Sequence, residues 1–585
     1  MSVDLVIRNA VVVDGTGGPP RHADVAVEGE LIVAVGGEIA PGHREIDAEG
    51  QMLTPGFVDP HTHYDGQATW DPWLAPSSQH GVTTVAMGNC GVGFAPVDPG
   101  RHDWLIAMME GVEDIPGTAL HEGLRWDWQS YPEYLDALDR QARTIDIGSH
   151  VPHAALRAFV MGDRGADPTE HPDEDELAGM ARLLEQGLEA GSLGVSTSRT
   201  ERHRTSAGEN LGTLRAREPE LLALASVLRS TGRGVFQLLS DSYCTTDDDF
   251  AASERGLVAE FARASRRPVS YTVQQDLAAP ERWRELMDLA TSLQAEGLDV
   301  KAQVAPRPIG VLLGLEASTC VLTPSRAYAR VAGLPLAERV AALREPELRR
   351  RILEGQTSLT QGEGAFAGYA FFARYDDMFV LDNPPNYDLD RSRSLGAAAR
   401  SLGIDPLEYA YDVQLQREGR QLIYMPLFNF VHGNLDAVRE MIGSPVALFG
   451  LSDAGAHCGQ ICDGSMTTTY MTMWARDRTG ADHIPIETVV HQITRRPAEQ
   501  YGWLDRGLVA PGMLADLNVI DLEHLECAPP EIVTDLPAGG RRFLQAATGY
   551  RMTIKRGAVT FEDGVATGQL PGRLLRGVQP GPGAS

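Results

Sequence analysis

Apolar and polar positions alternate through both ends of this 585-residue chain. Near the start, DLVIRNAVVVDG, ADVAVEGELIVAVGG and REIDAEGQMLTPG follow one another, with Gly and Asp turn signals between them. MLADLNVIDL at 513–522 and RMTIKRGAVTFEDGVATG at 551–568 show the same alternation near the other end. A period of two predicts strands with one buried face. Because a region of different character separates the two ends, we expect residues 1–55 and 502–585 to supply the two parts of one small β-sandwich.

Residues 56–501, between the two ends, show short apolar runs followed by longer stretches with helical spacing, such as EDELAGMARLLEQGLEAG. Alternation of strands and helices predicts an α/β fold, and eight strands predict a (β/α)8 TIM barrel. A long gap from about 305 to 420 predicts an inserted subdomain over the barrel mouth, and LIYMPLFNFV at 422–431 is a surplus strand candidate. The eight runs that read as strands are residues 56–58, 82–88, 144–150, 192–198, 234–240, 268–274, 298–304 and 446–452.

Two histidines, His61 and His63, stand one residue apart in GFVDPHTHYD. Residues i and i+2 of a strand point to the same side about 6.5 Å apart, so both imidazoles can converge on one metal ion. Pro60 suits the end of the preceding strand, where a ladder N–H is no longer needed. The pair therefore falls at the carboxyl end of a strand, where α/β barrels build their active sites. The spacing favours this interpretation over one in which one histidine caps a loop and the other packs in the core.

Two further candidate ligands follow other predicted strands. Cys90, in GNCGVGF, could bind zinc through its thiolate at about 2.3 Å, although a small buried cysteine is an equally good interpretation of this residue alone. Asp453, in VALFGLSDAGAH, directly follows the last strand, where a buried carboxylate is costly unless it is paired or bound to a cation. Because barrel closure makes the first and last strands neighbours, we expect Asp453 at the same mouth as the two histidines.

The acidic composition narrows the classes of partner. With 80 acidic and 51 basic residues the formal net charge is −29, which opposes binding to nucleic acid or to an anionic membrane surface. A small-molecule substrate is therefore expected, and a homo-oligomer is compatible with the sequence. No apolar run approaches the roughly 18 residues that span a bilayer, and MSVDLVIRNA lacks the pattern of a secretion signal. The six scattered cysteines predict reduced thiols and a cytoplasmic protein.

These motifs, in this order, resemble the amidohydrolase superfamily, and specifically its D-aminoacylase branch, the N-acyl-D-amino-acid deacylases. The resemblance implies a distorted TIM barrel, a small β-sandwich made from both chain ends, and zinc at the mouth. It also implies that Cys90 replaces the carboxylated lysine that bridges two metals in many relatives, and the GSLGVSTS strand indeed contains no lysine. The segments that carry the resemblance are PGFVDPHTH, GVTTVAMGNCG, HAALR, GSLGVSTS, GLSDAGAH and RGLVAPGMLADLNVID.

The chain departs from that branch on the fifth and sixth strands. D-aminoacylases carry further zinc-binding histidines there, in segments resembling ATHMR and SHHK, whereas this chain has FQLLSD and YTVQQD. We therefore expect one zinc ion held by His61, His63 and Asp453, with Cys90 near it or bound to it, and a second metal position that is lost or rebuilt. The replacements, none of them a good zinc ligand, are Leu239 and Val273 or, with a slip of a residue, Gln237 and Gln274.

The substrate pocket is also expected to differ from that of D-aminoacylases. Gln275 falls where the resemblance implies a substrate-binding lysine, and VAPRP at 304–308 replaces a tyrosine-containing segment. Arg307 is a candidate carboxylate clamp or, equally, a surface arginine. His153 is a candidate for the mouth, as are His150, His432 and His457, although such histidines are more often hydrogen-bonded in a core.

The leading functional hypothesis is zinc-assisted hydrolysis of an amide or related C–N bond. Asp453 would accept the proton of the attacking water and pass it to the leaving nitrogen, first as a general base and then as a general acid. A cyclic amide or imide hydrolase of the hydantoinase type is an alternative within the same class. A metal-free binding or scaffold protein is the alternative from another class, and the missing strand-five and strand-six histidines are its best support.

Overall fold

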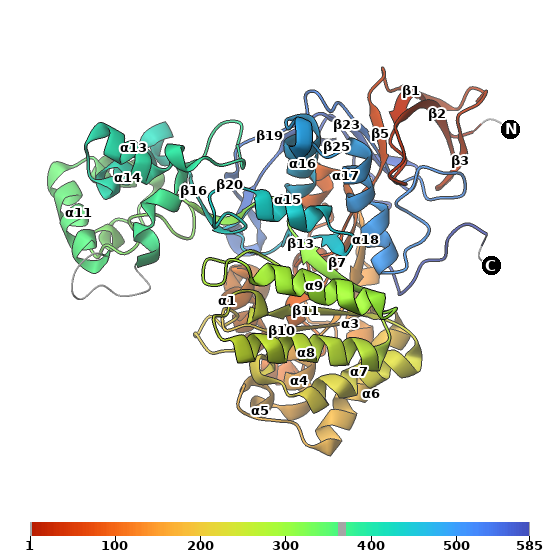
Figure 1. The fold of residues 1–585 in the computed structure, drawn as a ribbon, viewed down its shortest axis with the longest axis horizontal. Coiled ribbons are helices and arrows are strands. Elements are labelled where there is room, and N and C mark those ends of the chain that lie inside the picture. Colours follow the sequence, from red (N-terminus) through yellow and green to blue (C-terminus); the bar gives the residue numbers. More distant parts are fainter. Residues whose placement is uncertain (1–2, 361–369, 584–585) are drawn as a thin grey trace.

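The computed structural model describes residues 3–360 and 370–583. Strands from both ends of the chain join in one nine-stranded sheet, because β5 (Met52–Pro55) pairs antiparallel with β18 (Leu517–Ile520). The expected union of the two ends is thus confirmed, and both termini lie beside this sheet in Figure 1. The remaining strands are β1 (Leu5–Val12), β2 (Arg21–Glu28), β3 (Leu31–Val35), β4 (Arg44–Asp47), β23 (Tyr550–Lys555), β24 (Ala558–Glu562) and β25 (Val565–Ala566).

Every one of the eight predicted barrel segments contains a strand, and these strands are parallel. They form two sheets, ordered β6-β7-β8 and β17-β13-β12-β11-β10-β9. The sheets adjoin where only His150 separates β8 from β9, and again where a parallel bridge joins Thr62 to Ala454. The expected α/β class is confirmed, with a barrel-like strand order that is interrupted at these two places. The bounds are β6 (Phe57–Asp59), β7 (Val82–Met87), β8 (Asp146–Ser149), β9 (Val151–Pro152), β10 (Gly194–Arg199), β11 (Val235–Ser240), β12 (Val269–Thr272), β13 (Val300–Val304) and β17 (Ala447–Phe449).

Amphipathic helices cover the outside of these strands (Figure 1). In α6 (Glu174–Ala190) the helix begins with a capping box at Asp173 and ends at Gly191, whose φ of +105° suits glycine. Its buried residues Met180, Leu184 and Leu188 recur every four positions, so one face packs against the sheet. Other helices are α1 (His102–Glu113), α2 (Gly117–Gly123), α3 (Tyr131–Asp139), α4 (His153–Met161), α7 (Glu218–Thr231), α8 (Asp248–Ser265), α9 (Arg282–Ala295), α15 (Asp436–Gly443), α16 (Met466–Tyr470), α17 (Ile486–Ile493) and α18 (Arg495–Gln500).

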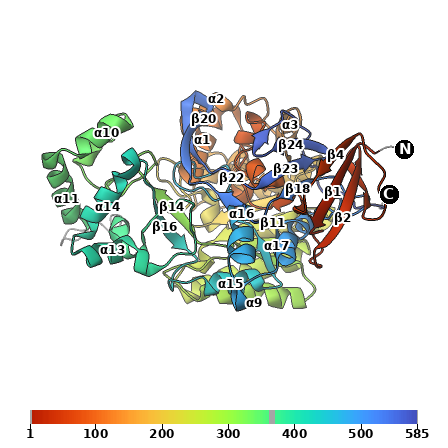
Figure 2. The ribbon, with the colours of Figure 1, turned by 90° about the horizontal axis from the view of Figure 1, so that it is seen from above.

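The predicted insert is a separate lobe, which projects from the rest of the chain in Figures 1 and 2. Its strands β14 (Ile309–Leu313), β16 (Ile423–Phe428) and β15 (Phe379–Val380) form an antiparallel sheet, so the surplus strand candidate belongs to the insert and extends it past residue 420. The lobe packs a hydrophobic cluster of its own around residues such as Leu313, Leu395 and Met425. Residues 361–369 of the predicted insert lie outside the described residues. The helices of the lobe are α10 (Leu336–Leu343), α11 (Pro346–Thr360), α13 (Leu395–Leu402) and α14 (Pro406–Gln414).

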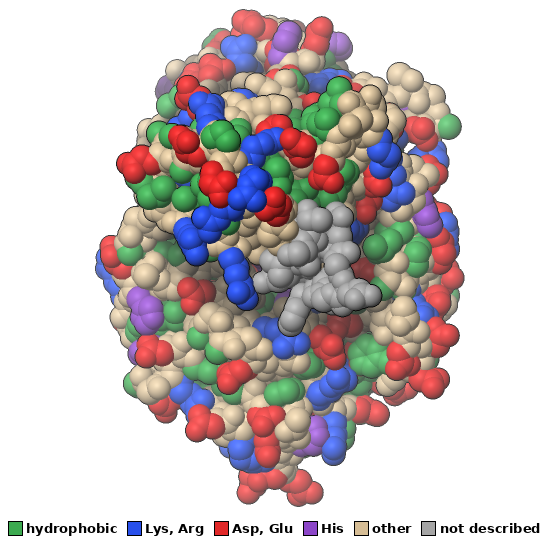
Figure 3. Space-filling view, turned by 90° about the vertical axis from the view of Figure 1, so that its left-hand side faces the viewer, with side chains coloured by type: hydrophobic (Ala, Val, Ile, Leu, Met, Phe, Trp, Pro, Cys, Tyr) green, Lys and Arg blue, Asp and Glu red, His purple; other side chains and the backbone are tan. Residues whose placement is uncertain are grey.

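The outer face of the insert carries side chains of both charges, with hydrophobic side chains among them. Acidic and basic side chains are interspersed on it in Figure 3, and several form ion pairs, such as Arg349 with Asp412 and Arg350 with Glu347. None of the helices in the described part of the chain combines the length and hydropathy needed to cross a membrane.

Candidate active site

The two histidines of the HxH motif lie side by side at the end of β6. Both are buried, and their ring centroids are 5.4 Å apart. Thr62, between them, points the other way and donates its hydroxyl hydrogen to the carbonyl of Ala86. Asp59 accepts the backbone N–H of His61, which fixes the turn that follows the strand. The alternation of a strand therefore continues through the motif and directs both imidazoles to one side.

Cys90 reaches the same place from the turn after β7. Its φ of +56° is unusual for a residue with a side chain, and Gly88 and Gly91 on either side of the turn also have positive φ. A Cβ on Gly91 would lie only 2.8 Å from the Cα of Thr197, so the close approach of this turn to β10 requires glycine. The Sγ of Cys90 lies 3.4 Å from Nε2 of His61. The ligand atoms of His61, His63 and Cys90 all lie within 4.8 Å of one another, an arrangement that can hold a metal ion.

Asp453 lies on the loop after β17 and approaches both histidines. Its Oδ1 is 3.2 Å from Nε2 of His61 and 3.6 Å from Nε2 of His63. The residue has a φ of +47°, so strained backbone occurs on both loops that supply non-histidine candidates. Burial would raise the pKa of Asp453, but its hydrogen bond to His63 and the nearby imidazoles hold that pKa well below its ordinary value. Burial lowers the pKa of His63 to about 4. At neutral pH the site thus presents a carboxylate and a neutral imidazole, the forms that bind metals.

Two buried glutamines, which the sequence did not identify as supports, orient the candidate ligands. Oε1 of Gln303, on β13, lies 2.6 Å from Nδ1 of His61. This contact places a proton on Nδ1 and leaves the lone pair of Nε2 facing Cys90 and Asp453. Oε1 of Gln237, on β11, accepts the backbone N–H of Cys90 at 2.7 Å and holds the strained turn. A glutamine inside an apolar strand, as in VKAQV, is the signal that could have revealed Gln303.

Glu113, the last residue of α1, brings a further buried acid that the sequence did not reveal. Its Oε1 lies 3.2 Å from Nδ1 of His63, and its Oε2 lies 3.8 Å from Nε2 of His457. Burial, reinforced by the charges of Asp453 and Asp65, raises the pKa of Glu113 well above its usual value. Burial similarly raises the pKa of the Cys90 thiol, and the charge of Glu113 adds to the effect. A bound cation would reverse both shifts by stabilising the ionised forms.

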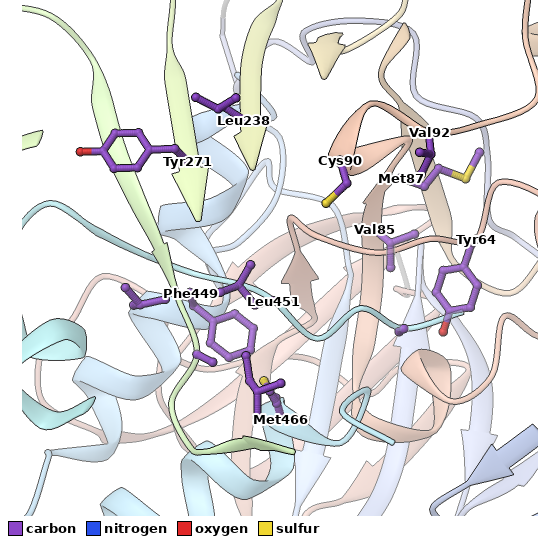
Figure 4. Close-up of a cluster of buried hydrophobic side chains, with 14 of the residues drawn as sticks. Tyr64, Val85, Met87, Cys90, Val92, Leu238, Tyr271, Phe449, Leu451 and Met466 are labelled. Carbon is purple, nitrogen blue, oxygen red and sulfur yellow. The ribbon is translucent and has the colours of Figure 1, made fainter. Parts of the chain in front are cut away.

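A cavity of about 740 Å³ between the strand ends and the insert is lined by His61, His63, Cys90, Glu113 and Asp453, among others. Cys90 stands at the edge of the adjoining hydrophobic cluster, which also includes Leu238, Phe449 and Leu451 (Figure 4). Two arginines line the wall, Arg202 and Arg374. Arg202 pairs with Asp276 at 2.9 Å and lies over the ring of Phe428 at 4.9 Å. Much of the remaining wall is apolar and is formed by Leu239, Leu277, Ile309, Val311, Leu427 and Ile461.

The three expected substrate-binding residues are not among the described residues that line this cavity. Arg307 is fully buried, pairs with Asp463 at 2.8 Å and stacks over Tyr387, so its guanidinium is already occupied. His153 is buried between Thr197 and Glu220, with which it makes contacts of 2.9 and 3.0 Å. Gln275 is buried and accepts the backbone N–H of Val431. The placement of all three favours structural roles.

The fifth and sixth strands of the series, β11 and β12, carry neutral groups at the positions where D-aminoacylases were expected to have histidines. Leu239 lines the cavity and Val273 is buried in the core. Gln274 and Thr272 also line the cavity, and neither Oε1 of Gln274 nor Oγ1 of Thr272 has a hydrogen-bond partner among the described residues. The described residues contain one group of at least three close histidine, cysteine or acidic ligand atoms, and it is the one at His61, His63 and Cys90.

Of the other histidines and cysteines considered as candidates, one lines the cavity and the rest lie elsewhere. His457 lines the cavity, whereas His150 is buried 3.3 Å from the hydroxyl of Tyr501 and His432 is paired with Glu281. Cys458 and Cys462 are buried free thiols and belong to no such ligand group among the described residues.

Comparison with known proteins places this geometry in a family. The model of the amidohydrolase family matches residues 44–561. The chain belongs to the amidohydrolase family. An N-acyl-D-glutamate deacylase of Alcaligenes xylosoxydans xylosoxydans is 31% identical, with 98% of this chain and 96% of that protein covered. An uncharacterized protein of Mycobacterium bovis is 29% identical over the same shares of the two chains. The expected membership of this family is thereby confirmed.

Two solved structures share the fold of this amidohydrolase. A D-aminoacylase structure matches with a TM-score of 0.63 at 23% identity, and the match covers 98% of this chain and 100% of the other. An N-acyl-D-glutamate deacylase of Bordetella bronchiseptica, in complex with zinc and a phosphonate inhibitor, matches with a TM-score of 0.62 at 23% identity over the same shares.

Proposed function

We propose that this amidohydrolase is a metal-dependent hydrolase that deacylates N-acyl-D-amino acids. The observation that carries the proposal is the convergence of His61, His63, Cys90 and Asp453 at the carboxyl ends of parallel strands. Family membership supports hydrolysis of a C–N bond other than a peptide bond, and the N-acyl-D-glutamate deacylase relative supports the class of substrate.

Zinc fits the donor set better than magnesium or calcium. Two imidazole nitrogens, one sulfur and one carboxylate oxygen are the ligand types that zinc prefers, whereas hard cations prefer oxygen alone. His61, His63 and Asp453 would hold the ion, with Cys90 on it or beside it. Bound there, zinc would acidify a water molecule and polarise the scissile carbonyl. One ion is proposed, because Leu239 and Val273 offer no second set of nitrogen ligands.

Asp453 is the residue best placed to move the proton. Its side chain is 20% exposed and lines the cavity, whereas the side chain of Glu113 is only 2% exposed. An ionised Asp453 can take a proton from the attacking water and return it to the departing nitrogen. His61 and His63, both buried, cannot serve this role while their ring nitrogens face the ion.

Arg202 replaces Arg307 as the proposed carboxylate contact. Asp276 and the ring of Phe428 hold the guanidinium in one plane, and 45% of the side chain remains exposed at the cavity. A planar guanidinium suits recognition of a single carboxylate. The apolar wall from the insert would then contact the acyl group or the amino-acid side chain.

The six free cysteines support a cytoplasmic location, which we propose together with this activity.

The replacement Asp453→Asn tests the proposal. We expect kcat for an N-acyl-D-amino acid to fall by about 10²- to 10⁴-fold, with an unchanged circular dichroism spectrum, because the proton acceptor is lost. Assays on the N-acyl-L enantiomers and on hydantoins, together with zinc analysis of the wild-type protein, separate this activity from the alternatives. Turnover that survives the replacement within a few-fold contradicts the role of Asp453, and a wild-type protein that binds no metal favours a scaffold.

A further inference from the structure

The structure assigns a function to Glu113 that no sequence motif indicates. We propose that Glu113 is a positioning residue of the metal centre, which holds the His63 ring through Nδ1 and so directs Nε2 of His63 toward the ion. This role rests on the metal site of the proposed function.

The distances join Glu113 to the back of the His63 ring. Oε1 of Glu113 and Nδ1 of His63 are 3.2 Å apart, and both side chains are only 2% exposed. Neither atom has a hydrogen-bond partner among the described residues, and the close contact between them is a charge contact, so each remains available to the other. The opposite ring nitrogen, Nε2, faces Asp453 at 3.6 Å. One side of the ring therefore meets a fixed acceptor, and the other faces the proposed ion.

The two metal-binding histidines would then be supported in different ways. His61 has a neutral amide acceptor, Gln303, at its Nδ1, whereas His63 has a carboxylate at the same position. A carboxylate that accepts the Nδ1 proton fixes the tautomer and makes the imidazole a stronger ligand. The support behind His63 is therefore the stronger of the two.

Backbone contacts fix Glu113 relative to the loop of Asp453. The N–H of His457 donates to the backbone oxygen of Glu113. The N–H of Gly459 donates to Oδ2 of Asp114 at 3.1 Å, and Asp114, which directly follows the last residue of α1, has a φ of +51°. These hydrogen bonds join the end of α1 to the loop after β17, which also carries Asp453.

A purely structural acid would be bound differently. Asp65, also fully buried nearby, accepts the backbone N–H of Gly88 at 3.1 Å. The carboxylate of Glu113 faces two imidazoles instead, those of His63 and His457. Burying a carboxylate is costly without a donor or a cation, and an isosteric amide would cost less. A role toward the ion explains why an acid stands here.

Zinc affinity of the metal-depleted full chain, measured in competition with a chromophoric chelator, tests the role. We expect Glu113→Gln to bind zinc about 10- to 100-fold more weakly than the wild type. We also expect the melting temperature of the metal-depleted variant to equal or exceed that of the wild type, because an amide costs less to bury here than an acid that has neither a hydrogen-bond donor nor a cation. If Glu113 served only the stability of the fold, the variant would keep the zinc affinity of the wild type and would melt at a lower temperature. The visible spectrum of the cobalt-substituted protein should change with Glu113→Gln, since the ring of His63 is no longer fixed.

Matched variants make the outcome decisive. Asp103→Asn removes an exposed acid from the same helix and should leave zinc affinity unchanged. Glu113→Asp keeps the carboxyl group but moves it away from His63, because the side chain is one methylene shorter. This variant should bind zinc about tenfold more weakly, and it tests the role even if Glu113→Gln does not fold. Zinc affinity of the folded Glu113 variants within twofold of the wild type, or an equal loss in Asp103→Asn, overturns this role alone. A wild-type chain that binds no zinc overturns the proposed function and this role together.

Discussion

Two of the buried clusters of charge in the described part of this amidohydrolase are neutralised in different ways. Between the terminal sheet and β8, Asp146 pairs with Lys555 at 2.9 Å, Arg506 at 2.7 Å and Arg556 at 2.8 Å. We call this the base cluster. At the mouth formed by the strand ends, Asp453 and Glu113 are paired with histidines, and neither is paired with an arginine or lysine in the described part of the chain.

The electrostatics of the two clusters differ accordingly. Burial alone would raise the pKa of Asp146, but the charges of Lys555, Arg506 and Arg556 outweigh it and hold this pKa far below its ordinary value. Burial raises the pKa of Asp59 and of Asp65, both near the mouth, to about 7. The base cluster supplies its own cations and so serves stability. The mouth is short of cations, which is understandable if a metal ion completes it.

The largest effect is expected from removing the two histidines at the mouth. The double replacement His61→Ala/His63→Ala should abolish zinc binding and lower kcat/KM by at least about 10³-fold, because the ion contributes several kcal/mol of transition-state stabilisation. Zinc analysis and steady-state kinetics measure these two results.

His153→Ala is the matched control, since His153 is equally buried but belongs to the network of Glu220 and Arg157. It should keep the zinc affinity of the wild type while lowering the free energy of unfolding. If the double variant still binds zinc, or if the control loses zinc, the histidines at the mouth do not form the metal site.

The contrast between the clusters also shows what the sequence could predict. The HxH pair, Cys90 and Asp453 follow predicted strands directly, so strand order alone brought them to one mouth. Glu113 comes from the end of a helix, and its approach to His63 depends on how α1 packs against the loop after β17. No short-range pattern contains that information.

Arg307 shows that a residue placed well in the sequence can still lie away from the site. As a residue just beyond a strand it was a reasonable candidate for the mouth, but its surroundings are set by Asp463 and Tyr387, which lie far away in the sequence. The supporting roles of Gln237 and Gln303 could have been predicted from the sequence, because burying a glutamine inside an apolar strand is costly unless its amide has a hydrogen-bond partner. The alternation of strands and helices predicted the fold class well, since it depends on local periodicity.

The second effect concerns the base cluster. Asp146→Asn should lower the free energy of unfolding by about 3–5 kcal/mol, because three buried cations lose the carboxylate that pairs with all of them. Zinc stoichiometry should stay the same. Urea denaturation followed by tryptophan fluorescence measures the change. Asp563→Asn removes an exposed partner of Arg551 and should cost at most about 1 kcal/mol. A base-cluster variant as stable as this control would show that the cluster contributes little to folding.

The smallest effect is the dependence of the base cluster on pH. Because the pKa of Asp146 is lower in the folded chain than the unfolded value of about 3.9, its stabilisation is complete above that value and is lost as the pH falls toward the folded pKa. The difference in unfolding free energy between the wild type and Asp146→Asn should therefore be constant from neutral pH to about 5 and shrink below that. Denaturation curves of both proteins between pH 7 and about pH 3.5 would test this. A difference that stays constant throughout would mean that Asp146 stabilises the fold through its shape and hydrogen bonds, not through its charge.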